Sequence, residues 1–172
     1  RETADIAFRS AVTGHFVLST LHTNSAIATL DRLDDIGVEP YMIGTALKGV
    51  ISQRLVRRIC PYCKEQHDPT EEELEMLGLD PNDHVNKSIK ISRGRGCTEC
   101  YQTGYRGRIV VVETLVMNKG VRDAIIARKS RDDINAAILE GGFEPVIENC
   151  RTLVREGITT PEEIERVVYT ED

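Results

Sequence analysis

Apolar residues in the first third of the chain alternate between helical spacing and one short continuous run. The continuous run covers residues 15–21 and has the length of a strand. Three other stretches place apolar side chains three and four positions apart, which predicts amphipathic helices. These predicted helices cover residues 2–12, 25–36 and 40–58. The order helix, strand, helix, helix is typical of a layered α/β fold.

Capping residues mark the beginning of two predicted helices. Asn24 or Ser25 is expected to cap the helix of residues 25–36, because short polar side chains accept hydrogen bonds from the free backbone N–H groups there. The segment "PTEEELEMLGL" predicts another helix, with Thr70 as its cap and Glu73 completing a capping box.

The second half of the chain predicts strands followed by helices. The segment "KSIKISRG" alternates with period two, and "GRIVVVETLVM" is a long β-rich run, so each predicts a strand. Helical spacing then continues to the end of the chain. The predicted helices cover residues 119–129, 131–140 and 145–156, followed by a helix whose start is marked by Thr160, Pro161 and Glu163.

The composition is that of an ordinary globular protein, with 172 residues of which 40% are hydrophobic and 29% charged. A net charge of -6 argues against binding to nucleic acid or an anionic membrane through bulk charge. No apolar run approaches the roughly 20 residues that span a bilayer, and no signal-peptide pattern opens the sequence. Since the chain begins with Arg1, we expect a fragment or a processed product.

Four of the five cysteines form two pairs, "CPYC" at Cys60 and Cys63 and "CTEC" at Cys97 and Cys100. Without a signal-peptide pattern, a reducing compartment is expected, where thiols stay reduced. Two C-x-x-C pairs then predict one tetrahedral zinc site with four cysteine ligands. A redox-active C-x-x-C is the alternative, but it needs one pair and leaves the second unexplained. Cys150 is most simply a small buried apolar residue.

Basic residues flank both cysteine pairs, and nucleic-acid binding is one interpretation of them. They are Arg54, Arg57, Arg58, Lys64, Arg93, Arg95, Arg106 and Arg108. A zinc ion with four thiolates carries a net charge of about -2, which nearby cations would offset. No aromatic interleaving indicates base stacking, so support of the zinc site or a subunit interface is favoured over nucleic acid.

Polar side chains gather after the predicted strand in "TGHFVLSTLHTN". Thr20, His22, Thr23 and Asn24 lie where the strand ends and the next helix begins. Ligands of open α/β sheets bind beyond the carboxyl ends of strands, and hydroxyl and imidazole groups there can contact a phosphate or orient a water. On this stretch alone, the favoured interpretation is that His15 and His22 are ordinary polar groups at the strand ends.

Four segments of the chain resemble the traffic ATPases of secretion and pilus systems. "ETADIAFRSAVTGHFVLSTLHTNSA" resembles their segment after Walker B, which contains the His box, and "QRLVRRICPYCK" resembles the stretch before their tetracysteine motif. "GCTECYQTGYRGRIVVVETL" resembles the second half of that motif, and "REGITTPEEIERVV" resembles their C-terminal end. The subgroup that fits best is the type II secretion and type IV pilus assembly ATPases.

The resemblance implies an α/β fold. The expected architecture is the C-terminal part of a RecA-like P-loop NTPase domain, followed by a zinc-binding tetracysteine subdomain and a helical C-terminal region. The expected boundaries are residues 1–59 for the part of the ATPase core that contains the His box, 60–117 for the zinc-binding subdomain and 118–172 for the helical region.

The resemblance also implies a function for the full-length protein. That protein would be a homo-hexamer that uses ATP and Mg²⁺ to drive assembly of a pilin or pseudopilin fibre. It would be cytoplasmic, at the cytoplasmic face of the bacterial inner membrane, held there peripherally through inner-membrane platform proteins, with no direct binding of nucleic acid. His22 and His15 match the two His-box histidines and are the implied catalytic residues. Thr20, Thr23 and Asn24 belong to the same element, in the region of the nucleotide phosphates.

The chain departs from this family in two motifs. It has no G-x-x-x-x-G-K-[ST] sequence, and hence no amide cradle and lysine for the β- and γ-phosphates. It also has no Walker B carboxylate ahead of Arg1 to support Mg²⁺. We therefore expect the fragment alone to be inactive as an ATPase. The alternative to a part of an ATPase is a stand-alone zinc-binding interaction module without catalysis.

Overall fold

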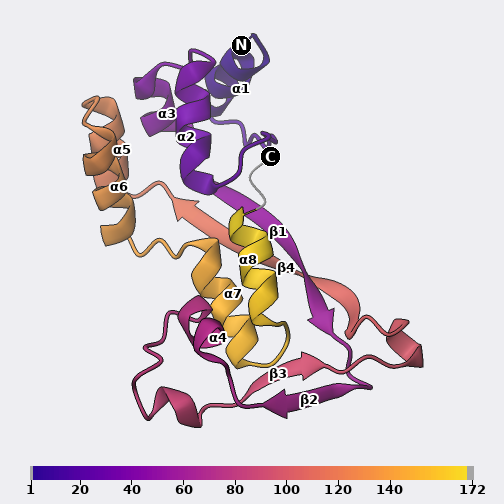
Figure 1. The fold of residues 1–172 in the computed structure, drawn as a ribbon. Coiled ribbons are helices and arrows are strands. Elements are labelled where there is room, and N and C mark those ends of the chain that lie inside the picture. The colour runs from indigo at the N-terminus through magenta and orange to yellow at the C-terminus, as the bar shows by residue number, and fades with distance from the viewer. Residues whose placement is uncertain (1, 170–172) are drawn as a thin grey trace. The chain divides into compact units, whose positions relative to one another are not determined.

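The computed structural model describes residues 2–169, which form two compact units (Figure 1). The first unit combines the chain up to Ser52 with Glu113–Glu144. The second combines Gln53–Val112 with the chain from Pro145 onward. Each unit therefore joins stretches that lie far apart in the sequence. No helix in the described part of the chain is long and apolar enough to cross a membrane.

Two long strands pair with each other and contribute residues to both units. They are β1 (Gly49–Ile59) and β4 (Tyr105–Val116), and β4 confirms the strand predicted from "GRIVVVETLVM". Burial alternates along β1, because neighbouring side chains of a strand point to opposite faces. Val56 is thus fully buried, whereas Leu55 is 63% exposed.

The first unit contains five helices among its described residues. They are α1 (Glu2–Val12), α2 (Ala26–Asp35), α3 (Pro40–Ala46), α5 (Lys119–Ile126) and α6 (Arg131–Glu140). α3 lies against α1 and α5, and α5 lies against α6. One apolar cluster joins these helices to β4 and includes Phe8, Leu30, Ile43, Leu115 and Val121.

The second unit contains a short antiparallel strand pair and three α-helices in the described part of the chain. Its elements are β2 (Lys64–His67), α4 (Glu71–Met76), η1 (Asn86–Ser88), β3 (Ile91–Gly94), η2 (Thr98–Cys100), α7 (Val146–Arg155) and α8 (Pro161–Tyr169). β2 and β3 pair antiparallel, with Lys64 opposite Gly94 and His67 opposite Ile91. A second apolar cluster includes Val56, Ile91, Val111, Val154 and Ile164.

The capping predictions hold for α2 and α4. The Ser25 side chain accepts a hydrogen bond from the backbone N–H of Ala28 at 3.0 Å, so Ser25 is the cap of α2. Thr70 and Glu73 form the predicted capping box, with bonds of 3.2 Å from the Glu73 N–H to the hydroxyl and 2.8 Å from the Thr70 N–H to the carboxylate. The four helices predicted after residue 118 are also confirmed, as α5 to α8.

The strand predicted for residues 15–21 is wrong. Residues 15–23 form neither helix nor strand, and the side chains of Phe16 and Leu18 are 87% and 83% exposed. A strand requires a neighbour that satisfies its backbone N–H and C=O groups. Among residues 2–169, the only strand pairs are β1 with β4 and β2 with β3.

The single helix predicted for residues 40–58 is also wrong. The helix α3 ends at Ala46, and the strand β1 begins at Gly49. The apolar residues of this stretch fit a period of two as well as a helical period, and β-branched Val50, Ile51 and Val56 favour the extended form. Pairing with β4 decides between the two periods.

Candidate metal centre and histidine segment

The four paired cysteines come together at one end of the antiparallel pair of β2 and β3. Cys60 follows β1 directly, and Cys63 immediately precedes β2. Cys97 and Cys100 belong to the η2 turn after β3. All four sulfur atoms lie within 4.8 Å of one another, and the two pairs interleave. Cys60 Sγ is 3.9 Å from Cys97 Sγ, and Cys63 Sγ is 3.8 Å from Cys100 Sγ.

This sulfur cluster has the dimensions of a tetrahedral metal site. Four sulfurs placed about 2.3 Å from a central zinc ion would be about 3.8 Å apart from one another. The distance of 3.7 Å between the sulfurs of Cys97 and Cys100 agrees with that expected sulfur–sulfur distance. All four are free thiols, as a metal site requires, and three of them are buried. The residues present therefore fit a single metal ion with four thiolate ligands.

Backbone amides support a negative charge on one of these sulfurs. The Cys100 Sγ accepts hydrogen bonds from the N–H groups of Cys97, at 3.2 Å, and Gly104, at 3.3 Å. Burial acts to raise the pKa of the Cys100 thiol, but these two N–H groups lower the pKa to about 6. For Cys63, burial and the neighbouring thiols raise the pKa to about 12. A bound cation would stabilise all four thiolates together.

Two glycines allow the backbones around the cysteines to touch. A Cβ atom at Gly94 would collide with the carbonyl group of Gly104, and a Cβ atom at Gly104 would collide with the carbonyl of Gly94. Gly104 also has a φ of 76°, a conformation that favours glycine. Its carbonyl accepts the N–H of Cys60 at 2.9 Å. The close approach thus brings the second cysteine pair against the first.

The basic residues near the cysteines are partly engaged with acids. Arg93 pairs with Glu65 at 2.9 Å, and Arg106 pairs with Glu99 at 2.8 Å. The Arg106 guanidinium also lies 5.1 Å from the centre of the Tyr62 ring. These contacts tie the turns next to the cysteines to neighbouring acids, and the offset of a zinc–thiolate charge by the basic residues stays a prediction.

Arg57 forms the most connected ion pair of the second unit. Its guanidinium and its backbone N–H both donate to the carboxylate of Glu163, whose side chain is 2% exposed. The same guanidinium lies 4.0 Å from the centre of the Tyr105 ring. This cluster is not predictable from the sequence, where Glu163 indicates only the start of a helix.

The histidine segment, residues 13–25, is largely exposed to solvent. His15 lies at its beginning, with Nδ1 3.3 Å from both the Ser10 carbonyl oxygen and the Thr13 hydroxyl. Thr20 and His22 are exposed in the stretch that forms neither helix nor strand. The sequence predicts that His15 and His22 lie at the two ends of a strand. The structure has no strand there, so neither histidine lies at a strand end.

The C-terminal end of the histidine segment is fixed to the fold at two points. The hydroxyl of Thr23 is 2.7 Å from the hydroxyl of Thr29 in α2. The backbone N–H of Ala26 donates at 2.5 Å to the carboxylate of Glu113, a residue of β4 that is 4% exposed. Asn24 lies between these anchors and is exposed. Glu113 was missed by the sequence analysis, because a single acidic residue in an apolar strand carries no distinctive pattern.

A sequence profile of the family described as "Type II/IV secretion system protein" matches residues 1–166. The chain belongs to this family. Type II secretion system protein E of Pseudomonas aeruginosa is 43% identical over 171 residues, which are 99% of this chain and 33% of that protein. Type IV pilus assembly ATPase PilB of Thermus thermophilus is 44% identical over 163 residues, which are 95% of this chain and 18% of PilB. The secretion-family chain thus spans a third or less of these relatives.

A solved structure shows the same fold. The crystal structure of the pilus retraction motor PilT with bound ADP superposes with a TM-score of 0.61 and 23% identity, and the match covers 99% of this chain and 37% of PilT. This likeness confirms the expected fold class, part of a RecA-like α/β domain, here combined with a tetracysteine element and C-terminal helices. The resemblance to type II secretion and type IV pilus proteins is likewise confirmed.

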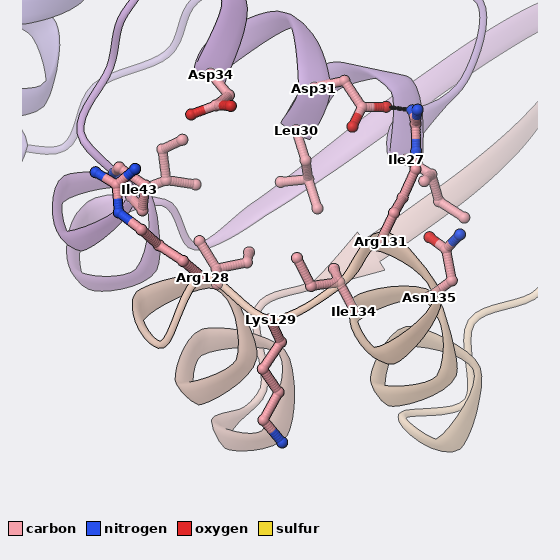
Figure 2. Close-up of a pocket in the computed structure, with 12 residues that line it drawn as sticks. Ile27, Leu30, Asp31, Asp34, Ile43, Arg128, Lys129, Arg131, Ile134 and Asn135 are labelled. Carbon is pink, nitrogen blue, oxygen red and sulfur yellow. Dashed lines mark ion pairs between the residues drawn. The ribbon is translucent and has the colours of Figure 1, made fainter.

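The first unit of this secretion-family chain also has a pocket of about 290 Å³ between α2, α3 and the α5–α6 connection (Figure 2). Leu30, Ile43 and Ile134 contribute apolar side chains to it. Figure 2 shows Arg131 reaching Asp31 in an ion pair on one side of the pocket. None of the residues that the sequence predicts to bind nucleotide or metal lines this pocket.

Proposed function

We propose that this chain is part of an ATPase that powers type II protein secretion or type IV pilus assembly. The observation that carries the proposal is the 43–44% identity to type II secretion system protein E and to PilB over at least 95% of the chain. Because the chain spans a third or less of these relatives, we assign hydrolysis of ATP, with Mg²⁺, to the longer protein and not to these residues alone.

For the nucleotide site, we propose that His22 acts near the γ-phosphate and that Thr20, Thr23 and Asn24 lie by the phosphates. Two observations support this assignment. His22 and Thr20 are exposed, so a nucleotide held by another part of the protein can reach them. Thr23 is hydrogen-bonded to α2, so the end of the segment has a defined position. An imidazole can donate to a phosphate oxygen and responds to charge near neutral pH.

For the cysteine cluster, we propose one structural zinc ion held by Cys60, Cys63, Cys97 and Cys100. Zinc favours four thiolates in a tetrahedron, and the sulfur spacing fits its bond length. The ion supplies folding free energy rather than chemistry, because all four coordination positions are taken by protein ligands.

For the assembly, we propose a homo-hexamer at the cytoplasmic face of the bacterial inner membrane. Its partners would be inner-membrane platform proteins of the secretion or pilus machinery, which hold it at the membrane peripherally. Direct binding of nucleic acid is not expected, since the chain carries a net charge of -6 and Arg57, Arg93 and Arg106 already pair with acids.

The decisive experiment measures ATP hydrolysis by the longer protein that contains this chain, with and without His22→Ala. Positioned acid–base or electrostatic groups are worth about 10²–10⁴ in rate, so His22→Ala should lower turnover at least about 10-fold. Nucleotide affinity and zinc content should stay nearly unchanged. His15→Ala should cost less, because the His15 imidazole already contacts the Ser10 carbonyl.

Two results would contradict the proposal at different levels. Turnover at the wild-type rate in His22→Ala would remove the catalytic assignment and leave His22 as a structural group. Absence of ATP hydrolysis in the wild-type longer protein would favour the alternative of a zinc-binding interaction module.

A further inference from the structure

Glu163 occupies an unusual position for a carboxylate, since it is almost fully buried in the first turn of α8. Its side chain is 2% exposed. It accepts hydrogen bonds from the Arg57 backbone N–H at 2.7 Å and from Arg57 Nε at 2.8 Å, and Arg166 Nη1 donates at 3.0 Å. A buried charge is tolerated when it is paired and hydrogen-bonded in this way, so losing one partner is costly.

Arg57 lies in β1 three residues before Cys60, so Glu163 is bonded to the strand that leads into the first cysteine pair, about 10 Å along it from Cys60. The segment that leads into α8 also lies along this end of β1. Thr159 Oγ1 donates to the Arg57 carbonyl at 2.8 Å, and the backbone N–H of Ile59 donates to the Ile158 carbonyl at 2.9 Å. These contacts hold β1 up to the residue before Cys60.

A second connection runs from α8 to the other cysteine pair. The Arg57 guanidinium stacks over the ring of Tyr105, and the Tyr105 hydroxyl lies 2.7 Å from the hydroxyl of Thr160. Tyr105 directly follows Gly104, whose N–H donates to Cys100 Sγ and whose carbonyl accepts the N–H of Cys60. Glu163 and its neighbours thus fix the backbone on both sides of the sulfur cluster.

We propose that Glu163 is a positioning residue for the metal centre, and that metal binding and docking of α8 stabilise each other. Glu163 does not touch the sulfurs; it acts through Arg57 on β1 and through Tyr105 on the turn that carries Cys100. The inference rests on the proposed metal site. By thermodynamic reciprocity, any increase in metal affinity caused by docked α8 equals the stabilisation of docked α8 caused by the metal.

The first test compares zinc affinity in Glu163→Gln and in Glu165→Gln, measured by competition with a chelating dye. Glu165 is an exposed acid on the same helix, so its variant removes the same charge without touching Arg57. Groups that contact and orient metal ligands typically change metal affinity 10- to 100-fold. Glu163 contacts none of the cysteines and acts only through Arg57 and Tyr105, so a smaller effect is expected. We therefore expect about 5- to 10-fold weaker binding for Glu163→Gln and a change within about 2-fold for Glu165→Gln.

The second test needs no variant and remains valid if Glu163→Gln does not fold. Hydrogen exchange of the wild-type chain is measured with zinc bound and after chelation. Amides of α8 should lose at least about 10-fold in protection when zinc is removed, whereas those of α6, in the other unit, should change far less.

Either of two results overturns the inference: equal zinc affinity in a folded Glu163→Gln variant, or α8 protection that is the same with and without zinc. Failure of the wild-type chain to bind zinc at all is a different outcome, which removes the proposed metal site itself and the inference with it.

Discussion

The Glu163 carboxylate accepts hydrogen bonds from both the backbone N–H and the guanidinium of Arg57, at 2.7 and 2.8 Å. Burial acts to raise the pKa of Glu163, but the donors of Arg57 and Arg166 outweigh burial and lower the pKa below its ordinary value of about 4.5. A carboxylate whose pKa is lower in the folded chain contributes stability that is present above the unfolded value. That contribution is lost as the pH falls through the folded pKa.

The first prediction concerns this pH dependence. Glu163→Gln should lower the free energy of unfolding by about 2 kcal/mol near neutral pH, because hydrogen bonds to a buried charge are lost. The difference between wild type and variant should shrink as the pH falls below about 4.5 and the wild-type carboxylate becomes protonated. Urea unfolding at a series of pH values measures both effects. A difference that stays constant from pH 7 to pH 3 would contradict the assignment of the lowered pKa.

The second prediction concerns metal content. Elemental analysis of the purified chain should give about one zinc per molecule, and Cys97→Ser should reduce it strongly. Structural zinc contributes about 10–16 kcal/mol in small peptides, compared with a total stability of about 5–15 kcal/mol for a domain. Chelation should therefore unfold at least residues 60–115, seen as loss of hydrogen-exchange protection there.

Cys150→Ala is the matched control for the metal prediction. Cys150 is fully buried in the apolar cluster of the second unit and lies outside the sulfur group. Its loss should reduce stability without changing the zinc content. A folded chain that contains no metal and has a disulfide between two of the clustered cysteines would rule the site out.

The sequence predicted the helix starts well because they depend on local chemistry. Ser25 and Thr70 accept hydrogen bonds from N–H groups three residues away, so the relevant partners are adjacent in the chain. The division of residues 40–58 between α3 and β1 depends instead on β4, which lies more than 45 residues further along the sequence. No local pattern could report that pairing.

The residues of the candidate sites likewise fall into those that the sequence predicts and those that depend on distant contacts. The cysteine cluster could be predicted because two C-x-x-C pairs have few alternative uses, and the structure brings the sulfurs together. The roles of Glu163 and Glu113 could not be predicted, because each carboxylate accepts a hydrogen bond from a backbone N–H more than 80 residues away in the sequence. The roles of His22 and His15 stay predictions, since both depend on a bound nucleotide and on parts of the longer protein that would hold it.

The third prediction concerns the exposed apolar side chains of the histidine segment. Phe16 and Leu18 are 87% and 83% exposed, which is unusual for two large apolar side chains so close together. The isolated chain should self-associate through them. Sedimentation velocity should show a larger monomer fraction for Phe16→Ser/Leu18→Ser than for wild type at equal concentration. Glu2→Gln, at an exposed position of α1, should leave the distribution unchanged.

The fourth prediction uses two neighbouring residues on opposite faces of β4. Leu115 is 1% exposed and belongs to the core of the first unit, whereas Val116 is 63% exposed. Leu115→Ala should lower the free energy of unfolding by about 2–5 kcal/mol, because it leaves a cavity. Val116→Ala should cost about 0.5 kcal/mol or less. Similar losses for both variants in urea unfolding would show that β4 does not present these faces as described.

The contact between Gly94 and Gly104 bears on how four-cysteine clusters of this kind are found in other genomes. A search pattern built on the cysteines alone accepts any pair of C-x-x-C motifs, including chains whose backbones cannot approach closely enough to complete the cluster. Here the second motif is enclosed by the two glycines in the order G-x-x-C-x-x-C-x-x-x-G. Protein designers who transplant this cysteine cluster should copy both glycines with the four cysteines, because even an alanine at either position would force the two loops apart.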